Sequence, residues 1–164
     1  MKITVISDSH RNDRRLKNAV DANRDSDLFI HLGDGLDEVW RLAETEPKLN
    51  FVFVMGNCDR HSYVEENIIE AAGQRIFYTH GHYYGVRSGI KDIVKRCSEL
   101  KCGILLYGHT HIPKIEYISG IHVMNPGSIS TPRGGSRPSY GVVTISEDGA
   151  VSMEIVEYKE PCAE

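Results

Sequence analysis

The first third of the chain alternates between strand-like and helix-like segments, and this order constrains the fold more than any other feature of the sequence. Strand-like runs span residues 2–7, 27–32 and 50–55, and amphipathic helical patterns lie between them at residues 12–23 and 36–44. A helix between two strands carries the chain back to its starting edge, so consecutive strands run parallel with right-handed crossovers. The unbroken apolar run at residues 50–55 further predicts a strand that is buried on both faces.

The remaining sequence predicts a second group of strands. Hairpins are expected around three glycine-containing turns, which pair residues 67–71 with 75–79, 114–118 with 121–124, and 140–146 with 150–157. A helix is expected at residues 86–100 and a buried strand at residues 103–107. We therefore predict an α/β fold in which two stacked mixed sheets are flanked by helices. The expected unit is a single domain over residues 1–164, with a peripheral tail from about residue 159.

Composition and charge narrow the functional classes. The 164 residues suffice for one domain with its own core, and 40% hydrophobic and 26% charged residues are ordinary for a globular protein. A net charge of −4 argues against an extended nucleic-acid surface, which would be basic. The longest apolar run, residues 51–55, is too short to span a membrane, and no signal peptide precedes the first strand. We expect a cytoplasmic protein with no membrane partner.

The cysteines indicate a reducing compartment rather than a structural zinc site. Cys58, Cys97, Cys102 and Cys162 form no CxxC pair, which argues against a zinc knuckle. They are expected to be free thiols. Cys97 and Cys102 are predicted to pack in the core, and Cys162 lies in a polar tail with no expected role.

Metal-binding residue types follow five of the predicted strands, at the point where each strand ends. In chain order they are Asp8 and His10, Asp34, Asn57 with Cys58 and Asp59, His80 and His82, and finally His109 and His111. Ligand sites of open α/β sheets lie just beyond the carboxyl ends of the strands, so we expect these side chains to converge. Carboxylate, amide and imidazole groups suit Mn, Fe, Zn, Co or Ni. The set exceeds what one ion needs and fits two ions about 3.5–4 Å apart, the arrangement used for phosphoryl hydrolysis.

Each of these motifs has a more ordinary interpretation when it is taken alone. Asp-x-His and Gly-His-x-His sequences also occur in surface turns, and only their joint occurrence at five strand ends favours a metal centre. His31 falls inside a strand and is expected in the core or behind the site, whereas His61 and His122 are expected to be ordinary surface or strand residues. The GxG sequence at residues 33–35 resembles the start of a dinucleotide loop, but Glu38 occupies the position of the third glycine.

In this order, the motifs resemble those of the calcineurin-like metallophosphoesterase family. The family pattern is DxH, GD, GNH followed by an acidic residue, a histidine at a strand end, and GHxH. The corresponding segments, within residues 1–145, are Asp8-Ser9-His10, Gly33-Asp34, Gly56-Asn57-Cys58-Asp59, His80 and Gly108-His109-Thr110-His111. The cysteine at position 58 and the Asn125-Pro126-Gly127-Ser128 segment are similar to the small prokaryotic YfcE-like phosphodiesterase branch. The resemblance implies a four-layer αββα sandwich around two divalent ions, usually manganese, with nickel, zinc, iron or cobalt as alternatives.

The resemblance also implies two sets of ligands. The first ion would be held by Asp8, His10, Asp34 and His111, and the second by Asp34, Asn57, His80 and His109, with Asp34 as the bridge. The implied activity is hydrolysis of a small phosphodiester by in-line attack of a metal-bridging hydroxide, which Asp8 would help to orient. The catalytic residues expected on this basis are Asp8, Asn57, Cys58 and His82.

One departure from the family pattern concerns the leaving group. Most members carry a histidine that helps to protonate it, whereas this chain carries Cys58, whose thiol is a weak donor with an ordinary pKa of about 8.5. General acid catalysis typically contributes about 10²–10⁴ in rate, so we expect modest turnover and a preference for acidic leaving groups. His82 either takes over part of this role or is a supporting or surface histidine.

Two further features each leave two interpretations open. Arg11 stands where the branch often has glycine, and it either contacts a substrate phosphate or is solvated. The loop at residues 128–139, which carries Thr131, Arg133 and Arg137, either lines a phosphate pocket or is a plain surface loop.

Two classes of function are compatible with these observations. One is an enzyme, and the other is a metal-binding protein-interaction scaffold with little catalysis, as in a similar eukaryotic retromer subunit whose metal site is degraded. The complete set of expected ligands favours the enzyme. A nuclease of related fold ranks lower because the chain is short, acidic and lacks an evident DNA-binding segment. The branch resemblance implies a homo-oligomer, either a dimer or a tetramer, and the sequence leaves the substrate and the native metal open.

Overall fold

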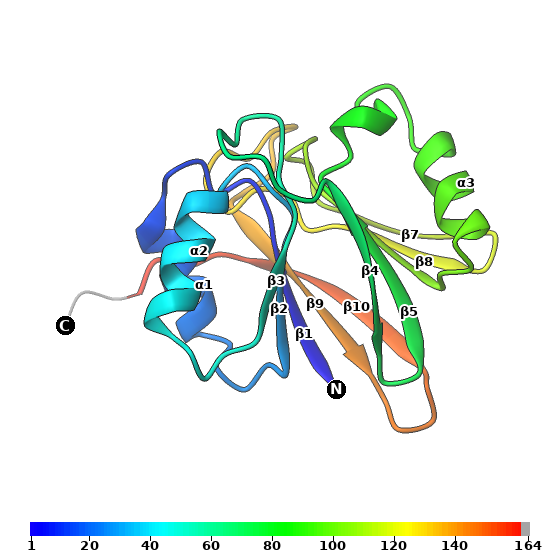
Figure 1. The fold of residues 1–164 in the computed structure, drawn as a ribbon, viewed down its shortest axis with the longest axis horizontal. Coiled ribbons are helices and arrows are strands. Elements are labelled where there is room, and N and C mark those ends of the chain that lie inside the picture. The colour runs from blue at the N-terminus through cyan, green and yellow to red at the C-terminus, as the bar shows by residue number, and fades with distance from the viewer. Residues whose placement is uncertain (162–164) are drawn as a thin grey trace.

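The computed structural model describes residues 1–161 and contains two mixed five-stranded sheets (Figure 1). The first sheet has the strand order β10 (Val151–Glu157), β9 (Ser139–Ile145), β1 (Lys2–Ile6), β2 (Leu28–His31) and β3 (Phe51–Phe53). The second has the order β4 (Glu66–Ala71), β5 (Gln74–Thr79), β6 (Ile104–Tyr107), β8 (Ile121–Asn125) and β7 (Lys114–Ile118). Cys162 lies outside the described residues.

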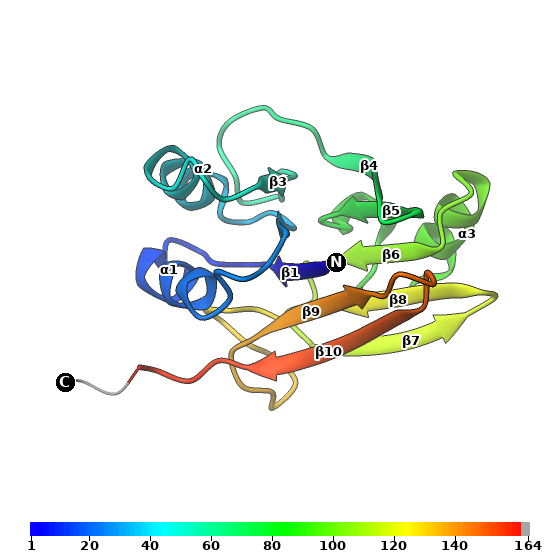
Figure 2. The same ribbon diagram turned by 90° about the horizontal axis from the view of Figure 1, so that it is seen from below.

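Helices cover the outer face of each sheet (Figure 2). The first sheet is covered by α1 (Asp13–Asp21) and α2 (Leu36–Thr45), and the second by α3 (Lys91–Glu99), with a 3₁₀-helix η1 (His82–Tyr84) before it. Asn12 caps the N-terminus of α1, since its side chain accepts a hydrogen bond from the backbone N–H of Arg15 at 3.1 Å. The predicted four-layer αββα sandwich is confirmed.

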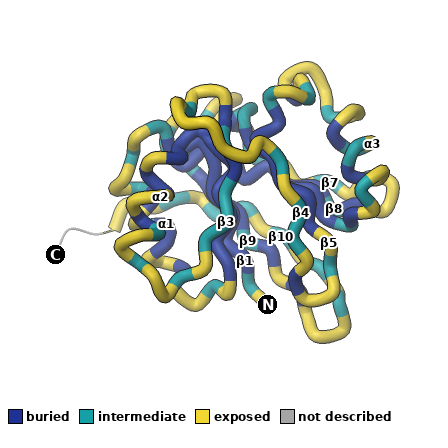
Figure 3. The backbone as a smooth tube through the Cα atoms, in the orientation of Figure 1, coloured by how far each residue is buried: buried dark blue, intermediate teal, exposed yellow. Residues whose placement is uncertain are grey.

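The main core lies between the two sheets. Its fully buried members come from both sheets and include Ile3, Val5, Ile30, Ile76, Ile104, Leu106, Met124 and Val143. Alternate residues of the same strands face the helices, so that Phe29 packs under α1 and α2 while Phe77 packs under α3. Figure 3 shows this burial of the strands, with the exposed residues concentrated in loops and on the outer helix faces. Burial on both faces explains why the inner strands read as continuous apolar runs.

The strand directions bring five loops to one edge of the molecule. β1 is parallel to β2 and β2 to β3, while β5 is parallel to β6 and β6 to β8. The carboxyl ends of β1, β2, β3, β5 and β6 therefore lie at the same edge, which is the upper one in Figure 1. This is the edge at which the sequence predicted a site.

Two predicted elements differ from the structure. The helix predicted at residues 86–100 begins only at Lys91, because Gly89 has a φ of 150° that is incompatible with helix. The strand predicted to be buried on both faces is shorter, as β3, and half-buried, because it lies at the edge of its sheet. Trp40 of α2 is exposed at this edge, where its ring meets those of Phe53 and Tyr63.

Several smaller predictions are borne out. Cys97 and Cys102 are buried free thiols, and Cys58 is an exposed one. His61 is exposed and His122 is half-buried on β8, in agreement with ordinary roles. Within the described part of the chain, every helix is too short or too polar to cross a bilayer.

Candidate metal centre

The loops after β1, β2, β3, β5 and β6 bring all seven predicted metal ligands to one place. Their backbone is strained there, since Asp8, His10, Asp34, His109 and His111 have φ values of 55°, 44°, 56°, 66° and 61°. Each left-handed residue other than glycine costs roughly 1–3 kcal/mol and persists only where the surroundings enforce it. Such strain at five of the predicted ligands indicates that the loops are built to aim these side chains.

The first group of ligand atoms belongs to Asp8, His10, Asp34 and His111, whose donors all lie within 4.8 Å of one another. Nε2 of His111 lies 3.0 Å from Oδ1 of Asp8 and 3.3 Å from Nε2 of His10. Nε2 of His10 lies 3.8 Å from Oδ2 of Asp34. The structure therefore brings together the four residues expected to hold the first ion.

The second group surrounds His80, which is fully buried. Its Nε2 lies 3.2 Å from Oδ1 of Asn57, 3.2 Å from Nδ1 of His109 and 3.5 Å from Oδ2 of Asp34. Asp34 thus reaches both groups through the same carboxylate oxygen, Oδ2. The four residues expected to hold the second ion are also together.

The hydrogen bonds around these residues leave unpaired acceptors that suit metal ions. His80 and His111 each donate from Nδ1 to a backbone carbonyl at 2.7 Å, so that in the neutral rings the lone pairs of Nε2 face the site. Oδ2 of Asp8 accepts from the Ser7 hydroxyl at 2.6 Å, whereas the buried Oδ1 accepts no hydrogen bond as long as Nε2 of His111, 3.0 Å away, is unprotonated. Converging imidazole nitrogens and carboxylate oxygens of this kind fit two divalent ions.

Both central carboxylates are held in their charged form. Burial acts to raise the pKa of Asp34, but the hydrogen bond and charge of His80 and the backbone N–H of Cys58 at 2.7 Å outweigh it and hold this pKa well below its usual range. Burial also acts to raise the pKa of Asp8. The hydrogen bond from His111 and the charges of His80 and His111 outweigh this effect and lower the pKa of Asp8. Both carboxylates are therefore ionised at neutral pH and can act as metal ligands.

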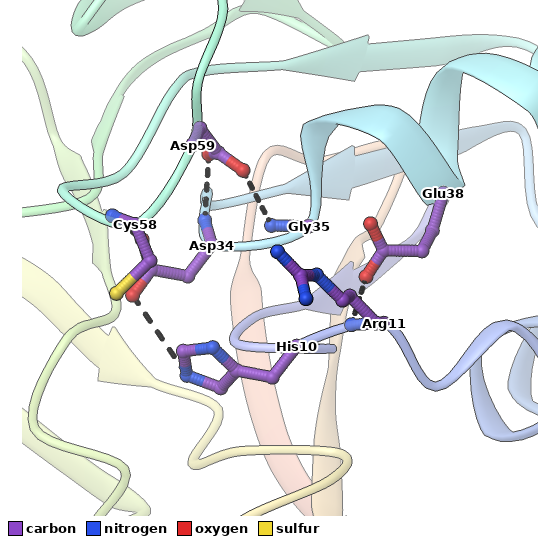
Figure 4. A pocket seen from close by; sticks show the side chains of 7 residues that line it. All are labelled: His10, Arg11, Asp34, Gly35, Glu38, Cys58 and Asp59. Carbon is purple, nitrogen blue, oxygen red and sulfur yellow. Dashed lines mark hydrogen bonds and ion pairs between the residues drawn. The ribbon is translucent and has the colours of Figure 1, made fainter.

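Asp59 ties the ligand loops together, a role that the sequence did not reveal. Its Oδ1 accepts from the backbone N–H groups of Gly35 and Leu36, both at 2.9 Å, and its Oδ2 from those of Asp34 at 2.9 Å and Gly56 at 2.7 Å. Figure 4 shows the carboxylate above the Asp34–Gly35 turn. The available signal was the acidic residue after the Gly-Asn-Cys motif, whose function only the structure makes clear.

Two glycines allow the loops after β2 and β3 to approach each other. A Cβ atom on Gly33 would lie 2.6 Å from the backbone nitrogen of Gly56, and a Cβ on Gly56 would lie 2.2 Å from Oδ1 of Asp34. Any side chain at either position would push the bridging Asp34 out of place.

A buried polar chain supports the loop after β1. The backbone N–H of Gly33 donates to Nδ1 of His31, so Nε2 of His31 donates to the Ser9 hydroxyl at 3.1 Å, and Ser9 donates to Glu38 at 3.2 Å. Glu38 also accepts from the backbone N–H of Arg11. Burial lowers the pKa of His31 to about 4, which keeps its ring neutral. His31 therefore lies behind the site as predicted, and Glu38 is part of this support rather than of a dinucleotide loop.

Cys58 and Arg11 line a cavity of about 310 Å³ beside Asp34 (Figure 4). Burial and the neighbouring Asp34 raise the pKa of the Cys58 thiol to about 11, so it stays protonated at neutral pH. The guanidinium group of Arg11 points into the same cavity and forms no ion pair with the described residues. Both side chains therefore lie in the cavity that Asp34 also lines.

His82 lies next to the second group of ligands, on η1. Its ring centroid is 5.4 Å from that of His80 and 6.1 Å from that of His109, and its Nδ1 is buried without a hydrogen-bond partner. Burial and the neighbouring His80 lower its pKa. The structure thus brings His82 to the site but pairs it with no other polar group.

The loop at residues 128–139 is part of the support of the site over its first residues. The Ser128 hydroxyl donates to the backbone carbonyl of Asp8 at 2.8 Å, and the carbonyl of Thr131 accepts from His111. The backbone N–H of Arg133 donates to the carbonyl of His111 at 3.0 Å. Arg137 instead points away and lies 3.8 Å from Glu157.

The chain belongs to the calcineurin-like phosphoesterase superfamily, whose domain matches residues 1–148. It is 34% identical over 152 residues to the probable metallophosphoesterase YsnB of Bacillus subtilis (strain 168), covering 92% of this chain and 88% of that protein. It is 29% identical over 169 residues to the phosphodiesterase YfcE of Escherichia coli (strain K12), covering 87% of each. The solved structure of the E. coli phosphoesterase YfcE superposes with a TM-score of 0.67 at 26% identity, covering 94% of this chain and 98% of that one. The predicted family and the likeness to YfcE are confirmed.

A second solved structure is also similar. Vps29 of Entamoeba histolytica, solved in complex with Zn²⁺, superposes with a TM-score of 0.71 at 23% identity, covering 95% of this chain and 98% of that one. At this level of identity the likeness shows a shared fold. Family membership and the four-residue ligand cluster together support a metal-dependent hydrolase at the level of the family.

Proposed function

We propose that this protein is a phosphodiesterase that uses two divalent metal ions to hydrolyse a small phosphodiester. The observation that most supports this is the position of Asp34. Its Oδ2 lies 3.8 Å from Nε2 of His10 in the first ligand group and 3.5 Å from Nε2 of His80 in the second. An anionic oxygen between two histidine-containing groups could serve both, and this supports a two-ion centre over a single site.

The protein side chains have separate tasks in this reaction. When bound, the two ions would supply charge neutralisation at the phosphate and lower the pKa of a water molecule. Asp8, fixed by Ser7 and by the backbone N–H of His109 at 3.2 Å, directs its free Oδ1 into the site and orients the attacking water. The planar guanidinium of Arg11 is placed to bind a phosphate oxygen. Asn57, whose Oδ1 lies 3.2 Å from Nε2 of His80, would help to hold the second ion.

The leaving group determines which esters react well. With a pKa of about 11, Cys58 is a neutral and weak donor, so the leaving oxygen departs largely as an anion. Esters of acidic alcohols such as nitrophenol are therefore the better substrates. His82 is the other candidate donor, and conversion to glutamine tests it. If His82 protonates the leaving oxygen, His82→Gln slows esters of weakly acidic alcohols much more than nitrophenyl esters.

Hydrolysis of bis-p-nitrophenyl phosphate by metal-stripped protein, with Mn²⁺, Ni²⁺, Mg²⁺ and Zn²⁺ restored one at a time, tests this function. We expect turnover that depends on metal and is lost in Asn57→Ala. The matched control is Asn67→Ala, an exposed amide on β4 outside the site, which keeps the activity of the unaltered protein. If the protein is folded and loaded with metal but shows no turnover, the proposal that it is an enzyme is refuted. That result supports the alternative, a metal-binding interaction scaffold with the fold of Vps29.

The same proposal includes the identity of the metal, the cellular compartment and the oligomeric state. We propose Mn²⁺ as the natural occupant, because the ligands are oxygen and imidazole donors without a thiolate. Free Cys97 and Cys102 are consistent with a reducing compartment, hence the cytoplasm. The exposed rings of Trp40 and Tyr63 suit a contact between copies in a homodimer or tetramer, which light scattering tests.

A further inference from the structure

A second cavity lies beside the loop that carries His109 and His111. Its volume is about 610 Å³, and its walls combine basic and apolar side chains: Arg87, Lys114 and Arg133 with Val86, Ile90 and Ile112. We call this cavity the basic groove. It is separate from the smaller cavity that contains Arg11 and Cys58.

The basic groove begins one residue away from the metal ligands. Along the segment that follows β6, His109 and His111 contribute to the two ligand groups, while Thr110 and Ile112 between and after them line the groove. Arg133 is joined to the same segment, because its backbone N–H donates to the carbonyl of His111 at 3.0 Å. The ligand groups and the groove therefore share this segment, and a substrate long enough to cross it would reach both.

The arginines of the basic groove are free to bind an anion. Most arginines of the chain pair with carboxylates, namely Arg14, Arg15, Arg24, Arg41, Arg75, Arg96 and Arg137. Within residues 1–161, Arg87 and Arg133 form no such pair, and Lys114 lies 3.0 Å from Glu116. Two unpaired guanidinium groups in one cavity are notable in a chain with a net charge of −4. Guanidinium groups match phosphate oxygens in both charge and geometry.

We infer that the basic groove binds the non-reacting part of the substrate, and that this part carries a second phosphate group on an apolar or planar body. The substrate class is thus a phosphodiester that also bears a phosphomonoester. Arg87 and Arg133 bind the second phosphate, and Ile90 and Ile112 contact the body between the two phosphates. The cavity with Cys58 then receives the leaving group. This inference rests on the proposed phosphodiesterase function.

Two esters that differ only in the second phosphate test the inference. They are p-nitrophenyl thymidine 5′-phosphate and the same compound phosphorylated at the 3′ oxygen, and both release nitrophenol from the same diester. For exposed, charge-assisted contacts we expect kcat/KM to be about tenfold higher for the 3′-phosphorylated ester. In Arg87→Ala/Arg133→Ala this ratio falls to about one. The control Lys95→Ala/Arg137→Ala removes the same charge outside the groove and keeps the ratio.

A binding measurement gives a readout that does not depend on turnover. By calorimetry, the Mn²⁺-loaded protein should bind thymidine 3′,5′-diphosphate about tenfold more tightly than thymidine 5′-phosphate, and the double arginine variant should lose this difference. A ratio near one in the unaltered protein, or a ratio that survives in the double arginine variant, overturns the inference alone. No hydrolysis of either ester with any of the four metals overturns the proposed function, and the inference with it.

Discussion

Replacing Asp59 by asparagine should loosen the metal centre without touching a metal ligand. Asp59 accepts four backbone hydrogen bonds, two on each carboxylate oxygen, from Asp34, Gly35, Leu36 and Gly56 at 2.7–2.9 Å. An asparagine keeps one oxygen and therefore one pair of bonds. Its amide nitrogen replaces the other oxygen and brings N–H groups against two N–H donors. The loops after β2 and β3 then lose their common acceptor.

The expected magnitude follows from these contacts. Hydrogen bonds to a charged group contribute about 1.5–3 kcal/mol each, and the half-buried position of Asp59 places them at the low end of that range. The loss of two such bonds predicts a fall of about 3 kcal/mol in the free energy of unfolding. Because Asp34 and the loop with Asn57 shift together, kcat/KM should fall by about 10²-fold, the effect expected when reacting groups move by roughly 1 Å.

Urea unfolding of the metal-free protein measures the stability, since bound metal would mask part of the change. The control is Asp25→Asn, an exposed carboxylate that forms an ion pair with Lys2, and it should unfold at nearly the urea concentration of the unaltered protein. Unfolding of Asp59→Asn at the urea concentration of the unaltered protein, together with full activity, would refute the reasoning. Asp59 would then be a surface acid that happens to lie near the turn.

Four further outcomes are expected. Cys58→His should raise kcat on a diester of a weakly acidic alcohol by about 10-fold or more while changing nitrophenyl esters little, because it restores a proton donor; equal effects on both esters contradict this. Ile104→Ala should cost about 2–5 kcal/mol in urea unfolding, because Ile104 is fully buried between the sheets, whereas exposed Ile115→Ala should cost under about 1 kcal/mol. Restoring Mn²⁺ to chelator-treated protein should raise the free energy of unfolding by about 2.7 kcal/mol at 100 times Kd, and Asp34→Asn should weaken this gain. The pKa of His31 is about 4 against an ordinary value of about 6.5, so the unfolded chain binds the proton first as the pH falls. The free energy of unfolding of the metal-free protein should therefore fall by about 1.5 kcal/mol through this group between pH 6.5 and 5. In His31→Gln the fall over the same pH range should be correspondingly smaller.

The sequence was sufficient to predict the two stacked sheets and the edge at which the polar residues gather, for a single physical reason. Parallel strands place their carboxyl ends at one edge, so the residue types that follow each strand predict what converges there. Asp8, Asp34 and His80 could thus be assigned to one place without coordinates. The buried strand predicted at residues 103–107 is likewise found, as the fully buried β6.

What the sequence missed depends on backbone contacts between segments far apart in the chain. No pattern marks Asp59 as the acceptor for two loops, or Ser128 as the donor to the carbonyl of Asp8. The predicted start of α3 was too early because the prediction relied on the spacing of apolar residues alone. The backbone conformation of Gly89 is incompatible with a helix, whatever that spacing is. The edge position of β3 was equally hidden, because a strand that pairs on one side only can be as apolar as one that pairs on both.

These missed contacts explain how strained ligands can be held in position before any ion arrives. Five of the candidate ligands adopt left-handed backbone conformations, and the strands alone do not impose them, because each of these residues lies beyond the end of its strand. The acceptor Asp59 and the donor Ser128 fix the two loops that carry the central carboxylates, Asp34 and Asp8. A metal ion then gains its full binding energy instead of spending part of it on ordering the loops. By the same reasoning, a chain that kept every ligand but lost Asp59 would retain the sequence signature of the family and bind its ions more weakly.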